Sequence, residues 1–87
     1  MTVEPFSIHI PDSEISDLRD RLQRTRFAPE FANDGWQYGA NGTYLQELLT
    51  YWANDYDWRA QEAEINRFSH FKTTIEDVPI HFIHEKG

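Results

Sequence analysis

The sequence contains no cysteine and few basic residues: eight Lys and Arg stand against 15 Asp and Glu, which gives a net charge of −7. Without cysteine the chain has neither disulfides nor thiolate chemistry, and its redox compartment is not indicated. A nucleic-acid partner would require a basic surface to neutralise phosphates, so we expect no nucleic-acid binding. The same acidic balance disfavours binding to the anionic surface of a membrane.

Long apolar runs are also absent from the sequence. No stretch approaches the roughly 20 apolar residues that a membrane-spanning helix needs, so we expect no membrane span. At the start, MTVEPFSIHIPDSEI, an acidic residue stands where a secretory signal has a basic region, and no apolar segment follows it. The sequence therefore predicts a soluble chain, most simply a cytoplasmic one.

Aromatic residues, by contrast, are abundant: the chain has six Phe, four Tyr and three Trp. Its 87 residues suffice for one small domain. Such a domain buries roughly 60–65% of its unfolded surface, so its own core is modest. Because each aromatic side chain carries a large apolar area, we expect some of them to face a partner surface.

The first part of the chain is typical of a short extended segment followed by a helix. Apolar residues alternate with polar ones over residues 6–10, as in a strand with one buried face. After Pro11, either Asp12 or Ser13 is expected to cap the helix. The helix has an apolar stripe formed by Ile15, Leu18 and Leu22. It also has two expected i,i+4 ion pairs, Asp17–Arg21 and Asp20–Arg24. Acids at its start and arginines at its end complement the helix dipole, so this pattern indicates a solvated helix face.

Residues 26–42, RFAPEFANDGWQYGANG, are predicted to form a long loop because Pro and Gly interrupt any regular pattern. The loop also contains Phe27, Phe31, Trp36 and Tyr38. A long loop with apolar anchors usually lies across another surface. The alternative is that Trp36 and Tyr38 stack on a sugar or another flat ligand.

Two further helices are predicted after this loop. The second begins at Thr43, where Thr43 and Gln46 match a capping box. Its apolar face is expected to contain Leu45, Leu48, Leu49 and Trp52, with Tyr44 and Tyr51 at the flanks. The third runs from Trp58 to about Arg67, with Asp57 as its N-cap.

The end of the chain, FKTTIEDVPIHFIHEKG, indicates a β-hairpin with strands at Phe71–Ile75 and Val78–His84. A two-residue turn at Glu76–Asp77 would pair Phe71 with Phe82, Thr73 with Ile80 and Ile75 with Val78. One face of the hairpin is then apolar. Because an isolated hairpin is marginal in water and an outer strand offers an open edge, we expect it to pair with something else.

No catalytic, cofactor-binding or metal-binding set is predicted. Glu62 and Glu64 point away from each other on the third helix, so they make no natural acid–base pair. His70 and His81 could meet diagonally across the hairpin, but two histidines without a third ligand are a weak basis for a zinc site. The chain has no nucleophile elbow, and GWQYGANG lacks the spacing of a phosphate-binding loop.

The run YLQELLTYWANDYDWRAQEAEINRFSHFKTTIEDVPIHFIHEKG resembles the N-terminal region of microsomal-type epoxide hydrolases, within the α/β-hydrolase superfamily. DLRDRLQRTRFAP and GWQYG extend the resemblance towards the start of the chain. It implies a fold that is mostly α with a C-terminal β-hairpin. Residues 1–67 would form a helical meander, and residues 68–87 would begin the α/β-hydrolase core as the first two strands of its sheet.

For the intact enzyme, the resemblance implies hydrolysis of an epoxide to a vicinal diol through a covalent Asp ester, without a cofactor. An Asp carboxylate opens the epoxide, two tyrosines donate hydrogen bonds to the ring oxygen, and a His-activated water hydrolyses the ester. In the family these residues all come later in the sequence, so residues 1–87 have no counterpart of them. The implied partner is the remaining α/β-hydrolase domain, in the same or a separate chain, whose core this segment would wrap and whose cap it would brace.

Two departures from the family pattern and two alternatives stand beside this interpretation. Members usually have an Asp-Gly-type turn where this chain has Glu76–Asp77, which leaves room for a longer or different turn. Some animal relatives begin with a membrane anchor; we expect none here, so that the chain resembles the soluble bacterial or fungal forms. The alternatives are a free-standing interaction module without catalysis and the N-terminus of an α/β-hydrolase that acts on another bond. A homo-oligomer is compatible with the sequence.

Overall fold

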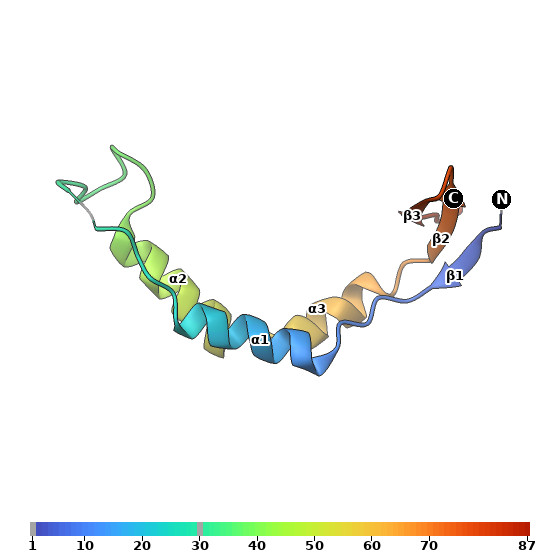
Figure 1. The fold of residues 1–87 in the computed structure, drawn as a ribbon, viewed down its shortest axis with the longest axis horizontal. Helices are drawn as coiled ribbons and strands as arrows, with labels where there is room; N and C mark the ends of the chain where they lie inside the picture. The colour runs from blue at the N-terminus through green and yellow to red at the C-terminus, as the bar shows by residue number, and fades with distance from the viewer. Residues whose placement is uncertain (1, 30) are drawn as a thin grey trace. The chain divides into compact units, whose positions relative to one another are not determined.

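The computed structural model describes residues 2–29 and 31–87, and within these ranges the chain forms three helices and three strands (Figure 1). The chain divides into two compact units. The sheet unit comprises the first residues through His9 together with Asp57–Gly87, and the helical unit comprises Ile10–Tyr56. Glu30, which falls in the loop predicted over residues 26–42, lies outside the described residues.

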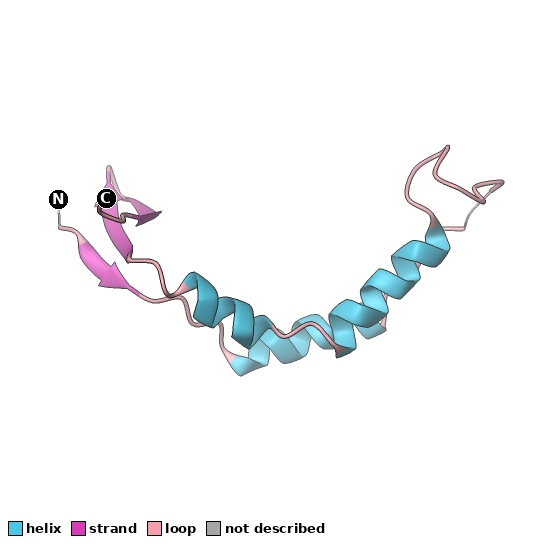
Figure 2. Cartoon of the chain, turned by 180° about the vertical axis from the view of Figure 1, so that it is seen from behind, coloured by secondary structure: helices cyan, strands magenta, loops and turns pink. Residues whose placement is uncertain are grey.

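The sheet unit contains an antiparallel sheet with the strand order β1-β2-β3, coloured magenta in Figure 2. Its strands are β1 (Glu4–Phe6), β2 (His70–Ile75) and β3 (Val78–Ile83). The strand β1 pairs with β2, with Phe6 opposite His70 and Pro5 opposite Phe71. The sequence indicated an extended segment at the start of the chain but not this pairing, so the hairpin is part of a three-stranded sheet. Pro5 is tolerated because β1 is an edge strand.

The predicted hairpin register is confirmed: Phe71 pairs with Phe82, Thr73 with Ile80 and Ile75 with Val78. The two-residue turn has φ of 49° at Glu76 and 66° at Asp77, both in the left-handed region. Positive φ at both central residues is the geometry of a type I′ turn, whose twist matches that of the flanking strands. The turn is therefore as short as predicted, although neither of its residues is glycine.

The helix α3 (Trp58–Ile65) belongs to the sheet unit and begins as predicted. The side chain of Asp57 caps it by accepting a hydrogen bond from Ala60 N at 3.1 Å. The helix ends two residues before Arg67, the end predicted from the sequence. Its last turn tightens into i→i+3 hydrogen bonds, from Arg67 N to Glu64 O and from Phe68 N to Ile65 O, each at 3.2 Å.

Just after α3, the side chain of Asn66 joins the two ends of the sheet unit. Ile8 N donates to Asn66 Oδ1 at 2.8 Å, and Asn66 Nδ2 donates to Ile8 O at 2.7 Å. Both backbone groups of Ile8 are thus satisfied by one side-chain amide instead of by a strand. This contact explains why the extended segment around Ile8 runs beyond β1 without further sheet pairing.

The first helix of the helical unit is α1 (Asp12–Gln23). The prediction that Asp12 or Ser13 is its N-cap is wrong: Pro11 holds that position, without a side-chain cap hydrogen bond. Pro11 O accepts hydrogen bonds from Glu14 N and Ile15 N at 3.0 and 3.3 Å, so the backbone alone closes the first turn. The proline ring fixes a φ of −58° next to the helix, and the helix starts one residue earlier than an Asp12 cap and two residues earlier than a Ser13 cap would place it.

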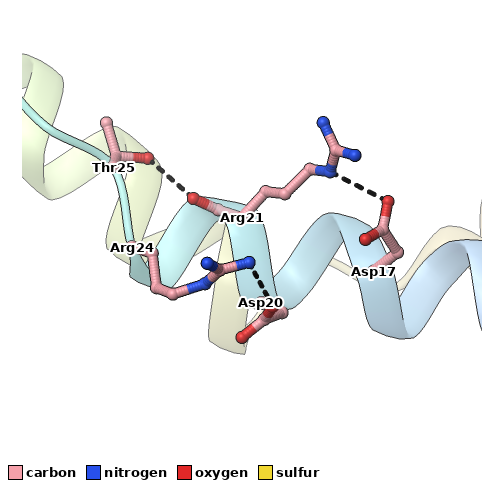
Figure 3. Close-up of polar contacts among 5 residues, drawn as sticks. All are labelled: Asp17, Asp20, Arg21, Arg24 and Thr25. Atoms are coloured by element: carbon pink, nitrogen blue, oxygen red, sulfur yellow. Dashed lines mark hydrogen bonds and ion pairs between the residues drawn. The ribbon is translucent and has the colours of Figure 1, made fainter.

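Both predicted ion pairs on α1 are confirmed (Figure 3). Arg21 Nε lies 2.9 Å from Asp17 Oδ2, and Arg24 Nη2 lies 2.6 Å from Asp20 Oδ2. At the end of the helix, Thr25 Oγ1 donates to Arg21 O at 3.2 Å. The four charged side chains are exposed, so each pair contributes at most about 0.5 kcal/mol to stability.

The second helix of this unit is α2 (Gly42–Asn54), and the predicted Thr43–Gln46 capping box is wrong. Asn41 is the N-cap, and its Oδ1 accepts a hydrogen bond from Tyr44 N at 3.0 Å. Asn41 Nδ2 also donates to the carbonyls of Asp34 and Gly35, each at 3.2 Å. The Asn41 side-chain amide accepts a hydrogen bond from the helix through its oxygen and donates two to the loop through its NH₂ group. A threonine hydroxyl has a single hydrogen and could donate only one.

Candidate functional site: exposed aromatic surfaces

Most apolar side chains of this chain remain exposed. Among the described residues, Ala53 is the one buried apolar side chain, at 7% exposure, and no large side chain is fully buried. The large apolar residues that stay exposed are Val3, Leu18, Phe27, Phe31, Trp36, Tyr38, Tyr44, Leu48, Tyr51, Trp52, Phe68, Ile75, Val78, Ile80 and Ile83. As the sequence suggested, aromatic area is available for contact with a further surface.

The apolar face predicted for α2 is covered along one of its edges and exposed along the other. Leu45 and Leu49 are half-buried and Ala53 is buried. Leu49 and Ala53 also line a cavity of about 320 Å³, together with Leu22 of α1. These three α2 residues therefore form the side of the helix that packs against α1. The second set lies next to them around the helix, on the part of the apolar face that α1 leaves exposed.

We name this second set the outer face of α2; it consists of Tyr44, Leu48, Tyr51 and Trp52. Their exposed fractions are 53%, 44%, 53% and 42%, respectively. Leu48, Tyr51 and Trp52 line a shallow groove of about 330 Å³ with Tyr56, whose ring centroid lies 6.5 Å from that of Tyr51. The outer face is a continuous aromatic surface because its members recur at i, i+4, i+7 and i+8.

The loop before α2 adds further aromatic side chains to this unit. Trp36 makes an edge contact with Tyr44, with ring centroids 5.3 Å apart, while Phe31 is 91% exposed. The side chain of Asn33 holds the loop, since it accepts a hydrogen bond from Tyr38 N at 3.3 Å. Stacking of Trp36 and Tyr38 on a sugar stays a prediction.

One face of the sheet is apolar and largely exposed. Phe71 and Phe82 stack on it with ring centroids 5.6 Å apart. Ile75, Val78 and Ile80 extend this face towards the turn, and all three are exposed. The period of two along each strand places these residues together, as the sequence predicted.

The opposite face of the sheet contains a buried histidine. His70 is 4% exposed, its Nε2 lies 2.7 Å from Ile65 O, and its Nδ1 lies 2.8 Å from His81 Nε2. A carbonyl oxygen only accepts, so His70 Nε2 carries the hydrogen; Nδ1 of the neutral ring then accepts a hydrogen bond from His81 Nε2. Phe6 packs its ring edge-on against His81 at 5.0 Å. The predicted approach of the two histidines is confirmed, and the sequence missed the contacts of Ile65 O and Phe6.

No group of three metal-ligating side chains gathers around this pair or elsewhere in the part of the chain that the structure describes. The two carboxylates considered on α3 each have an arginine partner. Glu62 is buried with its Oε1 2.8 Å from Arg59 Nη1, and Glu64 Oε2 lies 3.2 Å from Arg67 Nη1. The absence of catalytic, cofactor-binding and metal-binding residues from residues 1–87 stays a prediction.

Within residues 2–29 and 31–87, no helix has the length and apolar character to span a bilayer.

Comparison with solved structures defines the class of this chain. It superimposes on juvenile hormone epoxide hydrolase from the silkworm Bombyx mori with a TM-score of 0.84 at 34% identity, over 94% of this chain and 22% of that one. It superimposes on Aspergillus niger epoxide hydrolase with a TM-score of 0.87 at 30% identity, over 95% of this chain and 22% of that one. The fold is therefore that of one section of an α/β-hydrolase of the epoxide hydrolase class.

Sequence comparison then identifies the family. The family described as Epoxide hydrolase N terminus matches residues 3–87. Epoxide hydrolase 1 of Sus scrofa is 41% identical over 85 residues, which are 98% of this chain and 19% of that protein. A putative epoxide hydrolase of Stigmatella aurantiaca is 38% identical over 85 residues, with the same coverage. The chain belongs to the epoxide hydrolase N-terminus family, as the sequence suggested, and spans about a fifth of the length of these relatives.

Proposed function

We propose that this chain is the opening section of an epoxide hydrolase that converts an epoxide and water to a vicinal diol. The observation that carries the proposal is the family match over residues 3–87, which leaves no large part of the chain unaccounted for. Residues 1–67 would be the helical meander of that enzyme. Residues 68–87 would supply a hairpin to the hydrolase sheet, which it would enter together with β1.

In this proposal the chemistry belongs to residues outside the chain. An Asp carboxylate attacks one carbon of the epoxide, the C–O bond breaks, and two tyrosines donate hydrogen bonds to the departing oxygen. A histidine then takes a proton from water, which hydrolyses the ester and releases the diol. The mechanism requires no cofactor, and none of its groups is assigned to residues 1–87.

The contribution of residues 1–87 would be to wrap the hydrolase core and brace its cap. The outer face of α2 and the apolar face of the sheet support this role, because both are exposed. Burying a large apolar side chain contributes roughly 1.5–3 kcal/mol, so a surface of this kind stabilises an assembly that covers it. The remaining hydrolase domain would be the covering partner.

Turnover of styrene oxide by the full-length protein tests the proposed reaction. We expect formation of the phenyl diol, and replacement of the nucleophilic Asp by Ala should lower the rate by on the order of a thousandfold or more, as for other covalent nucleophiles. A nitrophenyl ester serves as the control substrate for another α/β-hydrolase activity. Ester hydrolysis without diol formation would show that the protein acts on a different bond, because a fold does not fix its chemistry.

The proposal includes a cytoplasmic location for the intact enzyme. Cell fractionation with an antibody against the chain tests it, and recovery in the membrane pellet would contradict it. Light scattering of the full-length protein would decide at the same time between a monomer and a homo-oligomer.

A further inference from the structure

Next to the side of α2 that packs against α1 lie two parallel rows of exposed side chains. Tyr44, Leu48 and Trp52 follow one another at i,i+4 spacing and form an apolar row. Glu47, Tyr51 and Asp55 follow one another at the same spacing and form an adjacent row with a carboxylate at each end. Every one of these six side chains is exposed.

The charges on this side of α2 are of one sign. No Lys or Arg occurs in the sequence between Arg26 and Arg59. Within the described residues, the carboxylates of Glu47 and Asp55 have no ion-pair partner, whereas Asp17 and Asp20 of α1 are each paired with an arginine. The acidic row is therefore unneutralised where it borders the apolar row.

The apolar stripe of a helix is normally covered by another element, and the stripe of α2 is wider than the part that α1 covers. The side of α2 with Leu45, Leu49 and Ala53 packs against α1, so one side is already covered. The exposed part offers a groove of about 330 Å³ between Leu48, Trp52 and their neighbours. Helices pack by inserting the side-chain ridge of one into such a groove of the other.

We propose that the outer face of α2 is a docking site for a helix of the remaining hydrolase domain that has an apolar i,i+4 row beside a row of Arg or Lys. The inference rests on the proposed function, because it takes its occupant from that domain. An apolar side chain of the incoming helix fills the groove. An arginine of its basic row lies over the ring of Tyr51 and reaches the carboxylates of Glu47 and Asp55.

Charge complementarity selects this occupant over the others. A helix with an acidic row would place like charges against Glu47 and Asp55, which is unfavourable in a desolvated contact. A second copy of this chain could offer the arginines at the end of its α1. Arg21 and Arg24 are engaged by Asp17 and Asp20, as Figure 3 shows. Among the described residues, Arg19 and Arg26 have no such pair and would be the ones a second copy offers. The remaining domain is the chosen occupant because this chain covers 22% of its solved neighbours, and a cross-linked dimer in the test below would favour the second copy instead.

Photo-cross-linking in the full-length protein identifies the occupant. Benzoylphenylalanine replaces Leu48 on the outer face, and in a control it replaces Arg19, an exposed residue of α1. We expect Leu48→benzoylphenylalanine to give an intramolecular cross-link to a peptide that contains Arg or Lys at helical spacing, and the Arg19 variant to give none there. A cross-linked dimer, or a cross-link to a peptide without basic residues, would overturn the proposal.

Amide hydrogen exchange of α2 in the full-length protein then tests the charges. We expect Glu47→Lys with Asp55→Lys to accelerate exchange at least tenfold, and the milder Glu47→Gln with Asp55→Asn to accelerate it about threefold. The difference in exchange rate between these variants and the wild type should shrink in 1 M salt, where the Debye length is about 3 Å. Glu14→Lys on α1 changes the charge by the same amount per site and should leave the exchange of α2 unaltered. Unchanged exchange in both double variants would refute the basic partner.

Styrene oxide turnover of the same proteins separates this inference from the proposed function. If the Leu48 cross-link fails to reach a basic helix while the unmodified protein still forms the diol, the docking proposal is wrong and the proposed function stands. If no diol forms at all, the proposed function is wrong. An intramolecular cross-link to a peptide with Arg or Lys would then still identify the segment that packs on the outer face of α2.

Discussion

In the turn between β2 and β3, two consecutive non-glycine residues adopt a left-handed backbone conformation. Glu76 and Asp77 hold φ of 49° and 66°. For an L-residue the left-handed region costs roughly 1–2 kcal/mol, and a short polar side chain such as Asp or Asn lowers that cost because it hydrogen-bonds locally. We therefore expect the substitutions Glu76→Asn and Asp77→Gly to stabilise the hairpin.

The size of the effect follows from opposing contributions. Glycine removes the left-handed penalty at position 77 but restores freedom to the unfolded chain, which costs about 0.4–1 kcal/mol. The net gain from Asp77→Gly is then about 0.5–1 kcal/mol, and Asn at position 76 adds a few tenths by the same reasoning. Since 1.4 kcal/mol corresponds to a tenfold equilibrium constant, the double variant should slow local opening about threefold to tenfold.

Amide hydrogen exchange measures this opening without requiring that the whole chain unfold cooperatively. The amides to follow are those of Thr73 and Ile80, which lie directly opposite each other in the hairpin. Glu76→Gln is the matched control, because it removes the same charge as Glu76→Asn without favouring the left-handed region. If the double variant exchanged as fast as the wild type, the turn would not hold the backbone conformation described above.

Substitutions at three other positions test the contacts that organise the sheet unit. His81→Phe should cost about 1–3 kcal/mol, because it leaves the buried Nδ1 of His70 without a donor; exchange of the β2 amides and the imidazole NMR signal of His70 report the loss. Asn66→Ala removes both hydrogen bonds to Ile8 and should lower the stability of the sheet unit by about 1–3 kcal/mol. Asn66→Asp keeps only the acceptor, so the Ile8 amide should stay slower to exchange than in the Ala variant. Asp57→Ala should cost about 1 kcal/mol of α3 stability, whereas Asp57→Asn should be nearly neutral, as measured by circular dichroism during denaturation.

Features set by short sequence spacing could be predicted, because the geometry of a helix or a strand determines them. The i,i+4 spacing placed Asp17 beside Arg21, and the period of two along a hairpin fixed its register and brought His70 to His81. The cap at Asp57 followed from a local hydrogen bond in the same way. In each case the interacting groups belong to one element or to two elements joined by a tight turn.

Features that depend on distant contacts could not be predicted. The strand β1 has only three residues, one of them proline, and its pairing joins residues more than sixty positions apart. Asn41 caps α2 because its amide also binds the carbonyls of the preceding loop, which no helix-start pattern contains. Sequence spacing placed the apolar residues of α2 on one stripe but does not say which part of it α1 covers.

The hairpin of β2 and β3 has one edge that β1 covers, so that β1 becomes the edge strand of the sheet there, and one edge that the described residues leave open. β1 pairs along β2, and Thr73 Oγ1 donates to Thr2 O at 3.0 Å, so the start of the chain closes that edge. Along β3, the bond from His84 N to Ser69 O at 3.0 Å and the alternation of an antiparallel ladder direct the amide positions of residues 79, 81 and 83 away from β2. Pro79 has no N–H, so this edge can donate only from His81 and Ile83. If the hydrolase sheet continues past β3, as the proposed function requires, its next strand must therefore take its hydrogen bonds at the end of β3 far from the turn.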